Sequence, residues 1–153
     1  MADDARLGHL AHLVRRFGGM LSRRPPAPDD EEWVASVLSS GEQALWVQLG
    51  NADRRHAIVV ARRFVAHRAI ASRAEIAGAL LHDIGKLDAG LGAVGRVVAT
   101  VIGPRGARLR SYHDHEALGA AALADIGSDP ITVALVAGRG PAADDLRLAD
   151  DHI

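Results

Sequence analysis

The chain contains no cysteine among its 153 residues, which excludes disulfides, thiolate metal ligands and a cysteine nucleophile. Aromatic residues make up only 3% of the chain, and neither sign of charge dominates, because 18 lysines and arginines face 19 acidic residues. The net charge of −1 produces no field that would direct the chain to nucleic acid or to an anionic membrane. The longest apolar runs, at 57–61 and 131–137, are far shorter than the roughly 18 residues of a membrane span.

The beginning of the chain also lacks the features of a secretory signal. Met1-Ala2-Asp3-Asp4 is acidic and has neither the basic head nor the apolar run of a signal peptide. We therefore expect a soluble, cytoplasmic protein. The length is that of one ordinary domain, so the chain is long enough to bury its own hydrophobic core. Lys86 is the only lysine, and every other basic residue is an arginine.

The apolar residues recur with the period of an α-helix through most of the chain. An amphipathic helix over 4–21 is predicted by apolar residues three and four positions apart, namely Leu7, Leu10, Val14, Phe17 and Leu21. The proline-rich stretch 22–28 then breaks the pattern. Only 97–102 has the composition of a strand, and its flanks favour a helix. We predict an all-α fold, with an N-terminal helical extension over 1–41 and a compact helical domain over 42–153.

Signals for helix starts divide the rest of the chain. Asp29 or Asp30 is expected to cap a helix that ends at residue 41. The segment Ser72–Glu75 has the form of a capping box ahead of the apolar run 76–81. Asp129 followed by Pro130 is a favourable start for a helix over 131–137. Further helices are expected over 42–49, 53–69, 93–102, 114–126 and 145–151.

The pair His82-Asp83 is the first candidate for chemistry. We expect it in the last turn of a helix that ends ahead of Gly85. There both side chains can converge on one ion, although adjacent residues within a helix point about 100° apart. An imidazole nitrogen and a carboxylate oxygen suit a borderline divalent metal such as Mn, Fe, Co, Ni or Zn. A capping or core role is the alternative, and the residues elsewhere in the chain favour the metal.

Further histidines and carboxylates precede and follow this pair. His56 stands near the start of the helix expected over 53–69, and His67 shares its face 11 residues later. His67 lies about 16 Å further along the helix axis, too far away to bind the same ion. The segment 113–116, His-Asp-His-Glu, and two aspartates at 150–151 follow. The alternative for the histidine at 115 is a local hydrogen bond at the start of a helix. The alternative for the aspartates is that they belong to a frayed end of the chain.

Four motifs occur in a characteristic order. They are Asp53-Arg54-Arg55-His56, then Ala79-Leu80-Leu81-His82-Asp83-Ile84-Gly85-Lys86, then His115-Glu116-Ala117-Leu118-Gly119-Ala120, and finally Leu148-Ala149-Asp150. In this order the chain resembles the HD-domain superfamily of metal-dependent phosphohydrolases, over about residues 45–153. The string at 79–86 is the most specific of the four. The resemblance implies a compact helical domain that binds metal and hydrolyses phosphate esters.

The resemblance also implies which residues bind the metal. His56, His82, Asp83 and Asp150 match the four ligands of such proteins, and Asp150 is preferred over its neighbour because it follows Leu-Ala. His115 matches a histidine that joins a second metal in dinuclear members or faces the substrate in mononuclear ones. Dinuclear members carry a further histidine before the last aspartate, and 127–147 contains none. We therefore expect one divalent ion, which is Mn, Fe, Co, Ni, Zn or Mg.

Hydrolysis assigns a role to each remaining residue of these motifs. A divalent ion lowers the pKa of bound water and polarises a P–O bond. Asp83 or Asp150 is expected to orient that water, and Glu116 to move its proton. Lys86, one turn beyond the His-Asp pair, is expected to neutralise phosphate oxygens, since a compact ammonium is kept where the chain otherwise uses arginine. His115 completes the expected catalytic set.

The expected substrate is a small phosphate ester, and a nucleotide fits best within that class. A degenerate module of the same fold, which binds a nucleotide or a protein partner without turnover, is the alternative. The adjacent residues Arg54 and Arg55 suggest phosphate binding, with a solvated helix face as the alternative. Pairs of arginines at 15–16 and 23–24 suggest a nucleic-acid surface, but the four acidic residues at 29–32 offset them, so we expect neither nucleic acid nor membrane as a partner.

Overall fold

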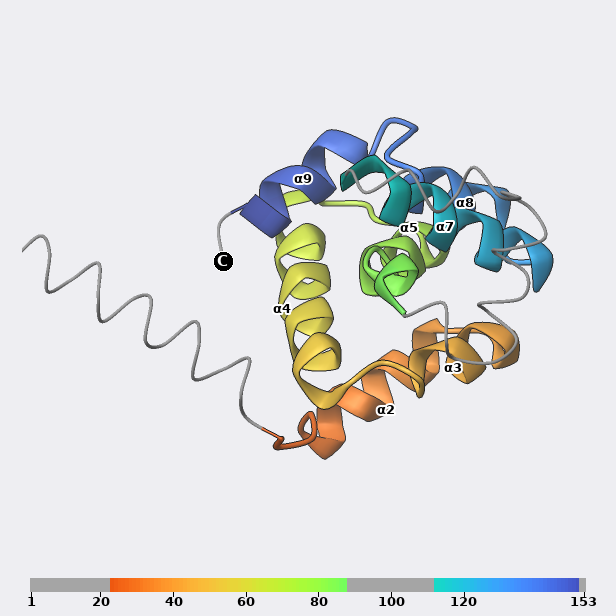
Figure 1. Ribbon diagram of the computed structural model, residues 1–153. Helices are drawn as coiled ribbons and strands as arrows, with labels where there is room; N and C mark the ends of the chain where they lie inside the picture. Colours follow the sequence, from red (N-terminus) through yellow and green to blue (C-terminus); the bar gives the residue numbers. More distant parts are fainter. Residues whose placement is uncertain (1–22, 88–111, 152–153) are drawn as a thin grey trace, which may run out of the picture.

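The computed structural model describes residues 23–87 and 112–151 (Figure 1). These residues form seven α-helices and one short 3-10 helix and contain no strand, which confirms the predicted all-α fold. The helices expected over 4–21 and 93–102 lie outside the described residues. The elements are, in chain order, α2 (Pro28–Val37), α3 (Ser40–Trp46), α4 (Asn51–His67), α5 (Arg73–Leu80), η1 (Ile84–Lys86), α7 (Tyr112–Asp125), α8 (Pro130–Val136) and α9 (Ala143–Asp151).

Two helices begin with a complete capping box. At the start of α5 the Ser72 hydroxyl accepts the Glu75 N–H, and the Glu75 carboxylate accepts the Ser72 N–H at 2.9 Å, as predicted. Ser39 and Glu42 make the same reciprocal contacts at the start of α3. This second box explains why α3 begins at residue 40 rather than at the predicted residue 42.

The starts of α8 and α2 differ in how well the sequence predicts them. Asp129 caps α8 as predicted, because its side chain accepts the backbone N–H two residues later. The predicted cap of α2 is wrong, since the helix begins at Pro28 with Ala27 as the N-cap, and it ends at residue 37 rather than 41. Proline suits the first helical position, where its missing N–H leaves no bond unmade. Asp29 and Asp30 lie instead in the first turn, where their negative charges interact favourably with the positive end of the helix dipole.

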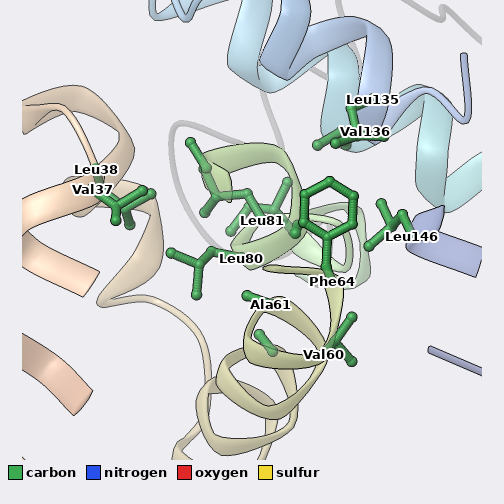
Figure 2. Packing of buried hydrophobic residues seen from close by; sticks show 14 of the residues in the cluster. Val37, Leu38, Val60, Ala61, Phe64, Leu80, Leu81, Leu135, Val136 and Leu146 are labelled. Atoms are coloured by element: carbon green, nitrogen blue, oxygen red, sulfur yellow. The ribbon is translucent and has the colours of Figure 1, made fainter. Parts of the chain in front are cut away.

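Helix α5 forms the centre of the hydrophobic core. Figure 1 shows it between α4 and α8, both of which it contacts. Its alanines and Leu80 are buried, and Phe64 of α4 joins the same cluster (Figure 2). A Cβ added at Gly78 would lie 2.9 Å from the Leu135 side chain of α8. Small residues in α5 therefore let its neighbours approach closely.

Part of the N-terminal extension belongs to this core. Val34, Val37 and Leu38 are buried in the same hydrophobic cluster as α4 and α5. Glu31 of α2 also accepts hydrogen bonds from the Trp46 indole N–H at 3.0 Å and from Arg54 at 2.9 Å. From Pro28 onward the extension thus packs onto the rest of the protein, and the boundary at residue 41 stays a prediction.

A close glycine contact joins η1 to α7. A Cβ on Gly85 would overlap the His115 carbonyl oxygen, and a Cβ on Gly119 would lie 2.9 Å from the Ile84 side chain. Both backbones therefore approach to a distance that only glycine permits. Because η1 directly follows His82-Asp83, this contact places the pair against α7 and the pocket described below.

Candidate metal centre and adjoining pocket

His82 and Asp83 lie in a turn between α5 and η1. The sequence predicts them in the last turn of the helix, but α5 ends at Leu80 and the backbone leaves the helical conformation at Leu81. Successive side chains in a regular helix point about 100° apart. Because the backbone leaves the helix here, the two side chains can face the same point. In the turn, His82 Nε2 and Asp83 Oδ2 lie 3.5 Å apart.

The His82 ring is held in one orientation by the backbone. Its Nδ1 lies 2.9 Å from the Ala79 carbonyl oxygen, which can only accept, so Nδ1 carries the hydrogen and donates it. The other nitrogen, Nε2, is buried and has no hydrogen-bond partner. A backbone acceptor on one nitrogen and an open second nitrogen is the usual arrangement of a metal-binding histidine.

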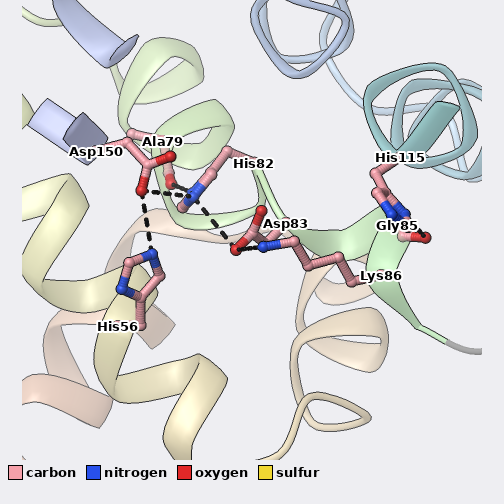
Figure 3. A network of polar contacts seen from close by, with 8 residues as sticks. All are labelled: His56, Ala79, His82, Asp83, Gly85, Lys86, His115 and Asp150. Carbon is pink, nitrogen blue, oxygen red and sulfur yellow. Dashed lines mark hydrogen bonds and ion pairs between the residues drawn. The ribbon is translucent and has the colours of Figure 1, made fainter. Parts of the chain in front are cut away.

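His56 and Asp150 reach the same point from two other helices (Figure 3). His56 Nε2, near the start of α4, lies 3.1 Å from Asp150 Oδ1 of α9, and His82 Nε2 lies 3.7 Å from the same oxygen. The two imidazole rings are 5.8 Å apart between centroids. Asp151 is exposed, whereas Asp150 is half-buried against both histidines.

Three of these side chains, those of His56, His82 and Asp83, have a suitable spacing for one ion, and Asp150 adjoins them. Single ligand atoms of His56, His82 and Asp83 all lie within 4.8 Å of one another, and Asp150 contacts both histidines. Ligands bonded to one zinc-like ion at about 2.1 Å lie at most about 4 Å apart, so small side-chain movements close the set. Two imidazoles and two carboxylates suit a borderline divalent metal. The buried, unpartnered Nε2 of His82 is the strongest single sign that the residues fit an ion.

Electrostatics at this point favour a positive charge. The imidazoles of His56 and His82 hold the pKa of Asp150 well below its usual range. Burial disfavours the His82 imidazolium, but the carboxylates of Asp150 and Asp83 outweigh burial and raise the His82 pKa. Two ionised carboxylates in a partly buried site therefore attract either a proton on the imidazole or a divalent cation in its place.

Lys86 lies at the rim of the group. Its Nζ forms an ion pair with Asp83 Oδ2 at 2.8 Å, and about half of its side chain is exposed. The ammonium thus lies beside a carboxylate of the group, and its expected contact with phosphate oxygens stays a prediction.

A pocket of about 40 Å³ adjoins the group, larger than the roughly 10–15 Å³ that one water needs. Its apolar wall comes from α8 and α9, and Gly138 lies in the loop between these helices. Its polar lining residues are His82, Asp83, Lys86, His115, Glu116, Arg147 and Asp150.

His115 and Glu116 reach the pocket but not the four-residue group. Figure 3 shows His115 beside Gly85 and away from His56, and its Nδ1 lies 3.4 Å from the Gly85 carbonyl oxygen. Glu116 borders Gly138, because a Cβ there would lie 2.8 Å from its carboxylate. His56, His82, Asp83 and Asp150 thus gather around one point, whereas His115 and Glu116 line the adjoining pocket.

Sequence reasoning missed Arg147, which also lines the pocket. Its Nη2 donates to the Gly138 carbonyl at 3.2 Å, and its Nη1 pairs with Asp144. A signal was present in the chain, since residues three apart share a helix face and Arg147 precedes Asp150 by three.

Two arginines considered for phosphate binding have contacts elsewhere. Arg54 forms an ion pair with Glu31 that joins α4 to α2, and Arg55 donates to the Arg24 carbonyl. His67 is exposed at the end of α4, away from His56, as its distance along the helix predicts.

Comparisons of the chain with protein-family models, curated proteins and solved structures gave no match. Among the described residues, none of the helices is long and apolar enough to cross a bilayer.

Proposed function

We propose that this protein is a metal-dependent phosphohydrolase of the HD type, with one divalent ion held by His56, His82, Asp83 and Asp150. One observation carries the proposal. Side chains from α4, from the turn after α5 and from α9 converge around the Nε2 of His82, which is buried and has no hydrogen-bond partner, beside a pocket with cationic residues.

The ion, when bound, would supply Lewis-acid activation of a phosphoryl oxygen and a lowered pKa for water. Asp83 presents Oδ2 to Lys86 as well as to the histidine, so the ammonium holds this carboxylate in place and brings positive charge to the pocket rim. Lys86 would neutralise a phosphate oxygen there. Glu116 lines the same pocket and would accept the proton of the attacking water.

The expected substrate is a small phosphate ester, with a nucleotide as the best candidate. His115 lines the pocket on the side away from His56. There it would contact the substrate rather than the ion, which supports a single-metal mechanism. Glu116 of α7 lies against Gly138 of the loop between α8 and α9.

Metal content is the first measurement, by elemental analysis of protein purified without chelator. We expect about one transition metal per chain in the wild type and loss of that metal in His82→Ala. His67→Ala is the matched control, because His67 is an exposed histidine outside the group. Near two ions per chain would overturn the single-ion site. If Mn, Fe, Co, Ni and Zn all fail to bind when added back, the hydrolase proposal is wrong.

A screen of phosphate esters on the metal-loaded protein then tests turnover. Asp83→Ala is expected to lose both hydrolysis and metal. Binding of a nucleotide that survives in Asp83→Ala, with no ester hydrolysed by the wild type, would instead identify a module that binds without turnover.

A further inference from the structure

We propose that Arg147 binds the phosphate group of the substrate. This inference rests on the proposed function. Arg147 lies on α9 three residues before Asp150, so one face of this helix presents both a candidate metal ligand and a guanidinium. Both residues line the same pocket as His82 and Asp83.

The guanidinium is oriented by the loop that closes the pocket. Its Nη2 donates to the carbonyl of Gly138, and its Nη1 pairs with Asp144 on the preceding turn of α9. A guanidinium has five N–H groups, so these two contacts leave further donors for an oxyanion. About 57% of the side chain is exposed, and a ligand can therefore reach it from solvent.

The charges of the pocket assign Arg147 a different role from Lys86. Lys86 forms an ion pair with Asp83, which belongs to the candidate metal ligands. The partner of Arg147 is Asp144, whose side chain is 93% exposed and lies outside the ligand group. An ion pair with such an exposed carboxylate is weak, so a phosphate can displace or share it at low cost.

Phosphate binding should depend on the metal. Three carboxylates line the pocket, those of Asp83, Glu116 and Asp150, against two cations, so an anion is disfavoured until a divalent ion is present. A divalent ion changes the net charge of these groups from −1 to +1, so the pocket then favours an anion. Binding of metal and phosphate is then reciprocal, each strengthening the other.

The test is calorimetric titration of inorganic phosphate into the full-length protein, with and without Mn²⁺. We expect binding to the Mn²⁺-loaded wild type and at least about tenfold weaker binding to Arg147→Ala, because hydrogen bonds to charged groups are strong. Arg139→Ala is the matched control, since Arg139 is an exposed arginine of the same loop that does not line the pocket. It should bind phosphate within about twofold of the wild type.

Equal phosphate binding by the wild type and Arg147→Ala would overturn the proposal, as would absence of phosphate binding to the metal-loaded wild type. Loss of metal in Arg147→Ala would also overturn it, because the arginine would then support the fold of the site rather than bind the ligand.

These outcomes separate the inference from the proposed function. If phosphate binding requires Arg147 but no ester is hydrolysed, the binding site stands and the hydrolase proposal fails. If esters are hydrolysed equally by the wild type and Arg147→Ala, the hydrolase stands and the role of Arg147 is wrong.

Discussion

His56 Nε2 lies 3.1 Å from Asp150 Oδ1, a contact between residues 94 positions apart in the chain. It joins the start of α4 to the end of α9, two helices that pack along one another. At the other ends of these helices Arg68 pairs with Asp145 at 2.9 Å. The positions of His56 and Asp150 in the candidate metal centre therefore depend on how α4 packs against α9. A substitution that shifts one of these helices would also change the distance between the two side chains.

Replacement of Asp150 by asparagine should weaken metal binding while preserving side-chain size. The amide is neutral, whereas a divalent ion binds best to ionised carboxylates. We expect Asp150→Asn to lower the apparent affinity for Zn²⁺ at least about tenfold in competition with a chromogenic chelator. Asp151→Asn is the control and should behave as the wild type, since Asp151 is exposed. Unchanged affinity in Asp150→Asn would exclude this residue as a ligand.

Replacement of Gly85 by alanine should destabilise the fold. The added Cβ would overlap the His115 carbonyl oxygen, so the backbone of η1 or α7 must move. We expect a loss of about 2–4 kcal/mol in the free energy of unfolding, measured by urea denaturation. Gly41→Ala is the control, because its Cβ would lie 3.4 Å from the Ile126 side chain, within the helical α3. That change should be neutral or stabilise the protein by up to about 1 kcal/mol.

Glu75 predicts a pH dependence of stability on the acid side. The hydrogen bond from Arg68 lowers the pKa of Glu75, despite an opposing effect of burial. A carboxyl whose pKa is lower in the folded state stabilises the protein above its unfolded pKa. That contribution is lost as the pH falls toward the folded pKa. The wild type should therefore lose stability more steeply than Glu75→Gln as the pH is lowered from about 5 to 3.

Thermal unfolding at several pH values measures this difference. The quantity to compare is the gap in melting temperature between the wild type and Glu75→Gln, which should narrow as the pH falls. Asp125→Asn is the control, since Asp125 is an exposed residue at the end of α7. A gap that stays constant over this range would show that the Glu75 charge makes no contribution.

Glu42 should be the most sensitive of the capping residues. Its side chain is fully buried, and its Oε2 accepts the Ser39 N–H at 2.8 Å and the Arg73 guanidinium at 2.9 Å. Glu42→Ala removes both contacts and should cost about 2–3 kcal/mol in the free energy of unfolding. Ser39→Ala removes only the weaker half of the box and should cost about 1 kcal/mol. Equal costs for the two variants would show that the contact between Glu42 and Arg73 adds nothing to the stability.

Much of the fold was predictable because its signals are local. A capping box depends on residues three apart, so Ser72 and Glu75 indicate the start of α5 directly. Asp129 with Pro130 marks α8 in the same way. The start of α2 was predicted wrongly because several residues there suit a helix terminus, and Pro28 takes the first helical position ahead of the two aspartates.

Local patterns along the chain were enough to predict the helical class, the starts of α5 and α8 and the residue types of the candidate site. How these residues meet follows from the packing of the helices, because that packing brings distant segments into contact. It places Asp150 rather than Asp151 against the histidines, and it brings Arg147 to the pocket. It also pairs Arg54 with Glu31. Local patterns can indicate which residues share a helix face, but not which residues of other helices they meet, since that is set by the rotation and contact of helices far apart in the chain.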